Sequence, residues 1–267
     1  MGHGIYRVYC CCYSGWACGE YTYNVRRNTA EIIVLKVILL AAGFGTRLRP
    51  LTEKTPKCLV SIKGRPLLDI WLEHLVAAGY GPFLLNTHYL SEQVEEYVIS
   101  SSYRDIVQLV YEPVLLGTAG TLIHNLNFFE EQPGLLIHAD NYCITDFNKF
   151  ILAHNARPKE CFLTMMTFRT EKPSTCGIAE LDERGVVVNF HEKKDNPPGD
   201  LANGAIYALS VGFMKILQNE FVGASDFSTE IIPMMLGNIF SYEVDGVLID
   251  IGTPEALASV NEGFGIS

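Results

Sequence analysis

The residues best suited to chemistry in this sequence lie in one short segment that follows an apolar run. Gly43 and Gly45 come directly after the run, and Arg47 follows them. A strand that enters a glycine-rich turn and then basic residues points backbone N–H groups at a phosphate, and glycine permits an approach that a Cβ would block. More positive charge follows, opposed within the segment only by Glu53, from Arg49, Lys54, Lys57, Lys63 and Arg65. The segment therefore predicts a phosphate-binding loop.

Two common phosphate loops fit this segment poorly. A dinucleotide-binding loop has a third glycine at the position where this chain has Leu48. It is also followed by an acidic residue about 20 residues later, and this chain has none at a suitable distance. The GK[ST] ending of an NTPase P-loop is also missing. As an isolated glycine pair, the segment could equally be a tight turn, so its neighbours decide its meaning.

The elements that must position this loop alternate along the first half of the chain. Continuous apolar runs predict buried strands, and apolar residues at helical spacing predict the helices between them. Because such alternation is typical of a parallel sheet covered by helices, we expect strands over 32–41, 82–87, 106–111 and 134–140 and helices over 65–80, 91–100, 119–129 and near 147–155.

The second half is richer in strands. We expect strands over 161–169, 177–192 and 203–210, with a hairpin turn at 182–185, and helices over 213–220, 228–236 and 254–262. The fold class predicted from both halves is α/β, with a Rossmann-like, mostly parallel sheet, helices on both faces and an inserted β-rich portion. We assign residues 31–267 to this domain and interpret residues 1–30 as a disordered or artefactual extension.

Composition narrows the function classes. A net charge of −10 argues against general affinity for nucleic acid or acidic membranes. No apolar run approaches the length of about 20 residues that a membrane span needs, and the first 30 residues lack the apolar core of a signal peptide. We therefore expect a cytoplasmic protein that binds neither nucleic acid nor membrane.

The segment "GFGTRL", followed by "PLT" and "TPKCLV", resembles the opening signature of the sugar-1-phosphate nucleotidyltransferases. Five later segments resemble further motifs of that family in the right order: "EPVLLGTAGTL", "LLIHADNY", "CGIAELDERGVVVNFHEKK", "NGAIYAL" and "VLIDIGTPEAL". The resemblance covers about residues 35 to 265. In two places the family usually has proline, where this chain has Cys58 after Lys57 and Lys194 after Lys193.

The resemblance implies a reaction in which an NTP and a sugar 1-phosphate give an NDP-sugar and pyrophosphate. It implies catalytic roles for Arg47 and Lys57 and binding of Mg²⁺ by Asp140 and Asp250. It assigns the nucleotide to Leu40, Ala41, Ala42, Gly43, Gly45, Thr46, Gly117, Thr118 and Ala119. It assigns the sugar phosphate to Asn141, Gly177, Glu192, Lys193 and Asn203 in the β-rich portion.

The two aspartates are far apart in the sequence, but each ends an apolar strand. Because parallel strands end at one edge of a sheet, where α/β proteins bind their ligands, we expect Asp140 and Asp250 to meet there. Two convergent carboxylates suit Mg²⁺, which also takes phosphate oxygens and water. We expect His138 to pack within its strand and His191 to lie at the surface.

The substrates remain open within the class. The sequence resembles most the mannose-1-phosphate guanylyltransferase-like members, which favours GTP with mannose 1-phosphate or a related sugar. The alternative is a uridylyl- or thymidylyltransferase acting on a glucose-type sugar 1-phosphate. A non-catalytic subunit that senses nucleotide sugars belongs to a different class, and the presence of Arg47, Lys57, Asp140 and Asp250 favours catalysis over it. The sequence is compatible with a homo-oligomer but does not specify one.

Overall fold

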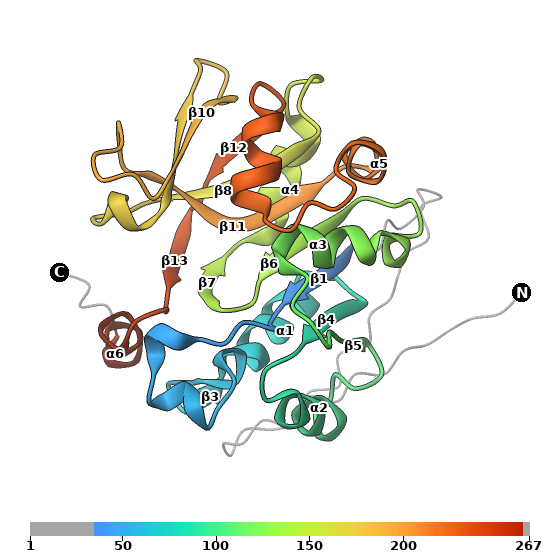
Figure 1. The fold of residues 1–267 in the computed structure, drawn as a ribbon, viewed down its shortest axis with the longest axis vertical. Coiled ribbons are helices and arrows are strands. Elements are labelled where there is room, and N and C mark those ends of the chain that lie inside the picture. Colours follow the sequence, from blue (N-terminus) through green and yellow to red (C-terminus); the bar gives the residue numbers. More distant parts are fainter. Residues whose placement is uncertain (1–34, 264–267) are drawn as a thin grey trace, which may run out of the picture. The chain divides into compact units, whose positions relative to one another are not determined.

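The centre of the fold is a group of parallel strands, shown in Figure 1. The computed structural model describes residues 35–263, and the extension over 1–30 lies outside the described residues. β1 (Lys36–Leu40) pairs in parallel with β6 (Gly134–His138) on one side and β4 (Phe83–Thr87) on the other. β4 pairs in parallel with β5 (Val107–Tyr111). The apolar runs of the first half therefore form the parallel strands that the sequence predicts.

The β-rich portion extends the same sheet. β11 pairs with β6 in antiparallel orientation and with β8 and β9, β9 pairs with β10, and β12 pairs in parallel with β8. Among the described residues, the result is one nine-stranded mixed sheet with parallel core strands, which confirms the predicted fold class. The added strands are β8 (Leu163–Arg169), β9 (Gly177–Leu181), β10 (Val187–Glu192), β11 (Leu201–Leu209) and β12 (Ile239–Glu243).

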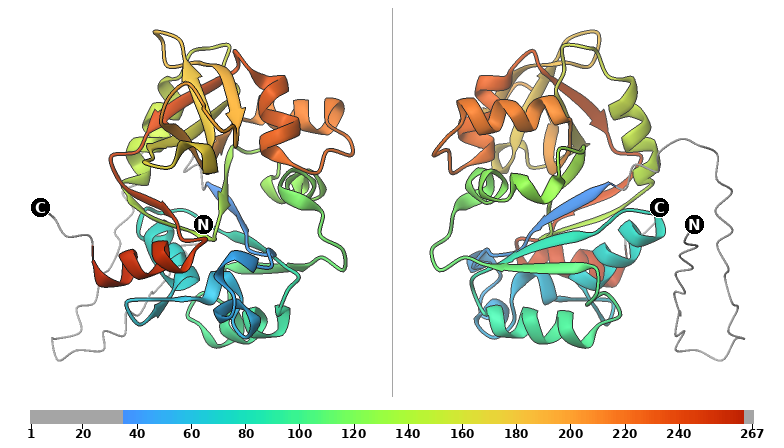
Figure 2. Two further views of the ribbon diagram at one scale, coloured as in Figure 1. Left: turned by 60° about the vertical axis from the view of Figure 1, so that its left-hand side comes forward. Right: turned by 90° about the vertical axis from the view of Figure 1, so that its right-hand side faces the viewer.

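Helices cover both faces of the sheet (Figure 2). Alternate residues of β1 enter two separate apolar clusters, with Val37 and Leu39 in one and Ile38 and Leu40 in the other. This alternation follows from the twofold period of a strand. The first cluster includes residues of α1 (Leu67–Ala77), α2 (Ser91–Ser100), α4 (Phe147–Ala156) and α6 (Pro254–Glu262), and the second includes residues of α3 (Gly117–His124) and α5 (Val211–Glu220).

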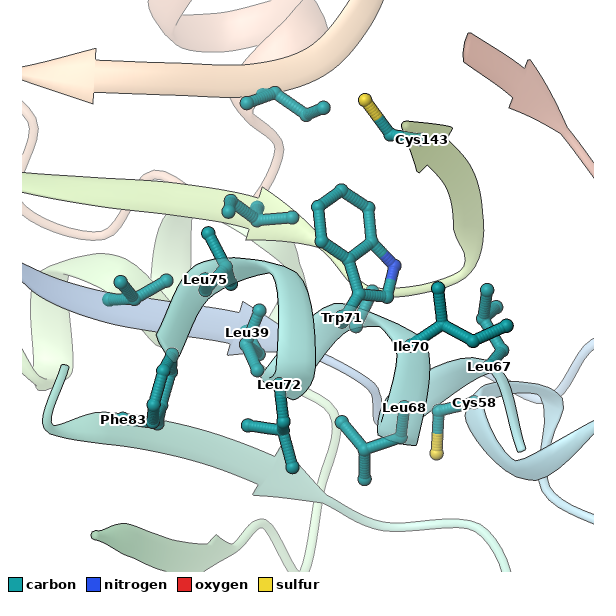
Figure 3. Close-up of a cluster of buried hydrophobic side chains, with 14 of the residues drawn as sticks. Leu39, Cys58, Leu67, Leu68, Ile70, Trp71, Leu72, Leu75, Phe83 and Cys143 are labelled. Carbon is teal, nitrogen blue, oxygen red and sulfur yellow. The ribbon is translucent and has the colours of Figure 1, made fainter. Parts of the chain in front are cut away.

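Helix α1 contributes several side chains to the first cluster (Figure 3). Leu68, Trp71, Leu72 and Leu75 are buried in it, and each such side chain contributes about 1.5–3 kcal/mol of hydrophobic stabilisation. The indole N–H of Trp71 donates to the carbonyl oxygen of Asn141 at 2.8 Å. Helix α1 therefore also fixes the backbone immediately after Asp140.

A separate antiparallel pair corrects one expectation from the sequence. Asp250 ends β13 (Gly246–Asp250), which pairs with β7 (Asn141–Thr145) outside the main sheet. The prediction that a parallel strand carries Asp250 to the sheet edge is wrong. The antiparallel register instead places Asp250 directly opposite Asn141, and so beside Asp140.

Two predicted helices differ in detail. The segment over 228–236 forms one π-helical turn and then a 3₁₀ turn, because Pro233 has no N–H to continue an α-helix. α3 begins two residues earlier than predicted and ends at His124, and a 3₁₀ turn follows. The turns are Phe227–Ile231 (π) and Leu126–Phe129 and Ile232–Met235 (3₁₀).

The remaining elements are short. β2 (Ser61–Ile62) pairs with β3 (Arg65–Pro66), and 3₁₀ turns cover Thr46–Leu48, Leu51–Glu53, Lys57–Leu59 and Pro173–Thr175. Within residues 35–263 we find no helix with the length and apolarity that crossing a bilayer would require.

Candidate active site

The loop after β1 contains two glycines with different surroundings. Gly45 has a φ of 61° and begins the turn Thr46–Leu48. Its carbonyl oxygen accepts from the Thr52 hydroxyl at 2.7 Å, and a Cβ on it would lie 2.9 Å from the Thr52 methyl carbon. A Cβ on Gly43 would meet nothing within 4 Å. The fold itself requires Gly45, whereas Gly43 faces open space.

That open space is a cavity of about 200 Å³ between the glycine loop and the start of α3. Gly117, on the α3 side, has a φ of 80°, and a Cβ there would lie 2.3 Å from the Ser225 carbonyl oxygen. Ala119 is fully buried and donates its N–H to the same oxygen at 3.0 Å, so it supports the wall without lining it. The predicted site residues that line the cavity are Leu40, Ala41, Ala42, Gly43, Lys57, Gly117, Thr118 and Asp140.

A buried polar network also lines this cavity, and the sequence analysis missed it. Glu112 is 2% exposed, and its Oε1 accepts from Asn86 Nδ2 at 3.0 Å and from the Thr121 hydroxyl at 2.5 Å. Glu112 Oε2 accepts from the Leu116 N–H at 3.1 Å. Asn86 Oδ1 accepts from the Ala41 N–H at 2.7 Å. The network ties β4 and α3 to the glycine loop. A sequence signal existed, because "EP" stands three residues before the second glycine motif.

Asp140 and Asp250 both lie close to the side-chain nitrogen of Lys57. Lys57 Nζ lies 2.9 Å from Asp140 Oδ2 and 3.5 Å from Asp250 Oδ1. The Lys57 side chain is only 7% exposed, whereas the two carboxylates are 40% and 43% exposed. Arg47 lies 3.2 Å from Asp250 Oδ2 and is 61% exposed. The structure therefore brings together the four residues that the sequence assigns to catalysis and metal binding.

A second cavity of about 200 Å³ opens beside these charges. It is lined by Gly45, Thr46, Arg47 and Gly252, and it shares Lys57 and Asp140 with the first cavity. A Cβ on Gly252 would lie 2.6 Å from a guanidinium nitrogen of Arg47. The two cavities thus form adjoining compartments, of which the second is bordered by cationic groups.

The charge state of Asp140 follows from its surroundings. Burial is the largest single influence on this carboxyl group and raises its pKa, but the charge and hydrogen bond of Lys57, together with His138 and a backbone hydrogen bond, outweigh burial, so the net pKa of Asp140 is lowered. Asp140 is therefore ionised at neutral pH and available to a cation.

The site fits a hard divalent cation. A positively charged nitrogen already lies within 3.5 Å of both carboxylates, so these groups can share one cation. Among residues 35–263 no group of three or more His, Cys, Asp and Glu side chains could hold a metal ion. Two carboxylates without further protein ligands suit Mg²⁺, which completes its shell with phosphate oxygens and water.

The predicted sugar-phosphate residues of the β9–β10 ribbon form a separate group. A Cβ on Gly177 would lie 2.3 Å from the Phe190 ring and 2.6 Å from Glu192 Oε2. Lys193 has a φ of 47°, is 67% exposed and lies 3.2 Å from Glu192 Oε1. The described residues that line the two cavities include no member of this group.

The two predicted asparagines hold a bulge in β11. Asn141 is buried, and its side-chain amide donates to the Gly204 carbonyl oxygen at 3.1 Å. Asn203 Oδ1 accepts from the Ala205 N–H at 2.9 Å, and its Nδ2 donates to the Tyr207 hydroxyl at 2.7 Å. Ala205 has a φ of 54°, which is costly for a residue with a Cβ. The structure thus shows a hydrogen bond from Asn141 to Gly204 that the sequence did not indicate.

The two histidines differ from each other. His191 Nε2 lies 2.6 Å from Glu180 Oε1 on the partly exposed face of the ribbon. His138 packs at the end of β6 as expected, but it also lines the first cavity.

Comparisons with known proteins agree with this geometry. Residues 36–264 match the nucleotidyl transferase family. The chain is 30% identical over 244 residues to the mannose-1-phosphate guanylyltransferase catalytic subunit beta of Drosophila pseudoobscura, covering 89% of this chain and 63% of that protein. The Xenopus tropicalis protein of the same name is 30% identical over 228 residues, with 83% and 62% covered. The chain thus spans about three fifths of the length of these curated relatives.

A solved structure with the same fold holds a nucleotide analogue. It is HddC from Yersinia pseudotuberculosis complexed with GMP-PN, which superposes with a TM-score of 0.73 at 26% identity. The superposition covers 86% of this chain and 99% of that one.

Proposed function

We propose that this chain, which belongs to the nucleotidyl transferase family, transfers a nucleoside monophosphate from an NTP to a sugar 1-phosphate. A phosphate oxygen of the sugar 1-phosphate bonds to the α-phosphorus, the bond from that phosphorus to the bridging oxygen breaks, and pyrophosphate leaves. The observation that carries the proposal is the convergence of Arg47, Lys57, Asp140 and Asp250 beside the glycine loop.

The reaction joins two anions, so the protein must supply positive charge and alignment. The sugar phosphate is already anionic at neutral pH, and no side chain is needed to remove a proton. Arg47 lines the cationic cavity and would hold the β- and γ-phosphates with its planar fork of donors. Lys57 borders both cavities and would stabilise the charge that develops around the α-phosphate.

Asp140 and Asp250 would hold a divalent cation, which in our proposal is Mg²⁺. When bound, this ion supplies neutralising charge at the α-phosphate. The chain's own contribution is the pairing of β13 with β7, which places the second carboxylate next to the first. On the acceptor side, Lys193 would bind the sugar phosphate and Glu192 would accept hydrogen bonds from sugar hydroxyls. Gly177, Asn141 and Asn203 would bind the sugar phosphate together with these residues.

The Glu112 network supports guanine as the base. Glu112 Oε1 already accepts two hydrogen bonds, whereas Oε2 accepts one and keeps a lone pair for a ligand. A buried acceptor favours a base edge with adjacent donors, and guanine offers N1–H beside its 2-amino group. Uracil and thymine offer one N–H flanked by two carbonyl oxygens, which a carboxylate repels. We therefore propose GTP, and the names of the relatives support mannose 1-phosphate or a related sugar as the acceptor.

A panel of substrates tests the proposed reaction. Pyrophosphate release is measured with GTP, UTP, dTTP, ATP and CTP, each combined with mannose 1-phosphate, glucose 1-phosphate and related sugars, in the presence of Mg²⁺. We expect GTP with a mannose-type sugar to give the highest kcat/KM. A higher value for UTP or dTTP with a glucose-type sugar would establish the alternative specificity, and no release in any combination would indicate a non-catalytic nucleotide-sugar sensor.

Exchange of Glu112 for glutamine is expected to reduce the preference for guanine. Inosine lacks the 2-amino group, so we expect the wild-type protein to prefer GTP over ITP by about 10-fold and Glu112→Gln to lose most of that preference. The kcat/KM ratio of GTP to ITP is the measurement, with exposed Glu53→Gln as the matched control. A wild-type ratio in Glu112→Gln would show that this carboxyl group does not read the base.

The two loop glycines are expected to respond differently to alanine. Gly45→Ala should lower the free energy of unfolding by about 1–2 kcal/mol, because it forces a Cβ into the left-handed region beside Thr52. Gly43→Ala should leave the thermal midpoint unchanged and weaken GTP binding by about 10-fold or more, because its methyl group enters the cavity. Thermal denaturation and calorimetric titration separate the two effects. Equal GTP affinity in Gly43→Ala would argue against nucleotide in this cavity.

A further inference from the structure

One side chain of the first cavity has no role in the mechanism above. His138 is the last residue of β6 and pairs in register with Leu40 of β1, which lines the same cavity. Its ring meets the edge of the Tyr207 ring, with 6.5 Å between the two centroids. Within the described part of the chain, His138 Nε2 is the one buried side-chain nitrogen or oxygen atom without a hydrogen-bond partner.

Such an atom is unusual, because native folds pair nearly all buried polar groups. Neither the Tyr207 nor the Thr118 hydroxyl group bonds to His138 Nε2. The Tyr207 oxygen accepts from Asn203 Nδ2 at 2.7 Å, and the Thr118 oxygen accepts from the Phe227 N–H at 2.8 Å. A leucine or methionine at position 138 would fill this space without an unpaired nitrogen. Packing of the fold alone therefore does not account for a histidine at position 138.

The imidazole can both donate and accept. A neutral imidazole carries one N–H, which can donate, and one bare nitrogen, which can accept. The ring also borders the cavity, and rotation about its Cβ–Cγ bond meets only a broad torsional profile. A small rotation can therefore bring a ring nitrogen to the cavity wall.

The position of the His138 ring along the cavity indicates which part of a bound nucleotide it would contact. In the proposed complex the base lies at Glu112 and the α-phosphate lies at Lys57 and Asp140, so the ribose must lie between them. His138 lines the same cavity as Glu112, Lys57 and Asp140. It also lies beside the glycine-loop strand through its register with Leu40. His138 is thus next to the stretch that the ribose would occupy.

We propose that His138 recognises a ribose hydroxyl group of the bound nucleotide. This inference rests on the proposed function, because it needs a ribonucleotide in the first cavity. His138 is a specificity residue that hydrogen-bonds the 2′- or 3′-hydroxyl, and it makes the site prefer ribonucleotides over the matching deoxynucleotides.

Direct binding tests the proposal without the sugar substrate. Calorimetric titration with Mg²⁺ and GTP, 2′-deoxy-GTP or 3′-deoxy-GTP is carried out on the full chain. We expect the wild-type protein to bind one of the two deoxy forms about 10-fold more weakly than GTP. His138→Leu should bind GTP as weakly as that deoxy form and should not discriminate between them. His138→Gln should recover part of the preference, and exposed His124→Leu is the matched control.

Other outcomes are also decisive. If His138→Leu keeps the wild-type preference for GTP, or if the wild-type protein binds all three nucleotides equally, the ribose contact is wrong while the proposed function stands. A change only in the KM for the sugar 1-phosphate would also overturn it. If the wild-type protein binds no nucleoside triphosphate, both the inference and the proposed function fall. Thermal denaturation of each variant should show an intact fold, because the substitution removes an imidazole nitrogen that has no hydrogen-bond partner in the fold.

Discussion

Replacing Asp140 by asparagine is expected to lower kcat/KM by about 1,000-fold while the protein stays folded. Asparagine keeps the shape of aspartate but removes its charge, which is the property that a divalent cation needs. The lowered pKa of Asp140 means that the wild-type group is fully charged at neutral pH. The substitution therefore removes one full negative charge. Lys57 keeps Asp250 as a partner at 3.5 Å, which limits the effect on stability.

The measurement is pyrophosphate release at a series of Mg²⁺ concentrations. Asp140→Asn should require more Mg²⁺ for half-maximal activity, and its thermal midpoint should remain within a few degrees of the wild-type value. Asp105→Asn removes a charge from a carboxylate that is 85% exposed and pairs with neighbouring Arg104, so it should leave turnover unchanged. Unchanged turnover in Asp140→Asn would contradict the metal assignment.

Replacing Lys57 by methionine is expected to lower kcat by about 100- to 1,000-fold, the usual effect of removing one charged stabiliser of a transition state. Methionine fills the buried path of the side chain but leaves Asp140 and Asp250 without their shared ammonium group. Nucleotide binding should weaken less than turnover, because Arg47 and the glycine loop remain.

Single-turnover rates and GTP affinity separate these two effects for Lys57. Lys54→Met is the matched control, because Lys54 is exposed in the same segment and its loss removes the same charge. Lys57→Arg should not restore the rate, because a guanidinium group is larger and Lys57 is only 7% exposed. Equal losses in Lys54→Met and Lys57→Met would mean that the net charge of the segment matters, rather than the position of Lys57.

Local features of the chain were predictable because they depend on nearby residues. The apolar run over 32–41 predicts a buried strand whatever its partners are, and its described part contains β1 over Lys36–Leu40. The spacing of Leu68, Leu72 and Leu75 predicts α1. Gly43, Gly45 and Arg47 stand close enough together to indicate a phosphate loop, and that role stays a prediction. The order of the motifs then gives the family, and with it the fold.

Contacts between distant segments were not predictable in the same way. The pairing of Asp250 with Asn141 joins two short strands that lie outside the main sheet, and no local pattern specifies such a register. The Glu112 network gathers side chains from β4, α3 and the segment between them, and a buried charged residue looks like a surface residue in the sequence. Asn141, which stays a predicted sugar-phosphate residue, also donates to the Gly204 carbonyl oxygen, and no local pattern indicates that contact.

A crystal structure with Mg²⁺ and a non-hydrolysable GTP analogue tests the central claim most directly. We expect one cation bound by both Asp140 and Asp250, the guanine beside Glu112, and the triphosphate along the glycine loop near Arg47 and Lys57. An analogue bound elsewhere in clear density, or a cation that contacts neither carboxylate, would contradict the account.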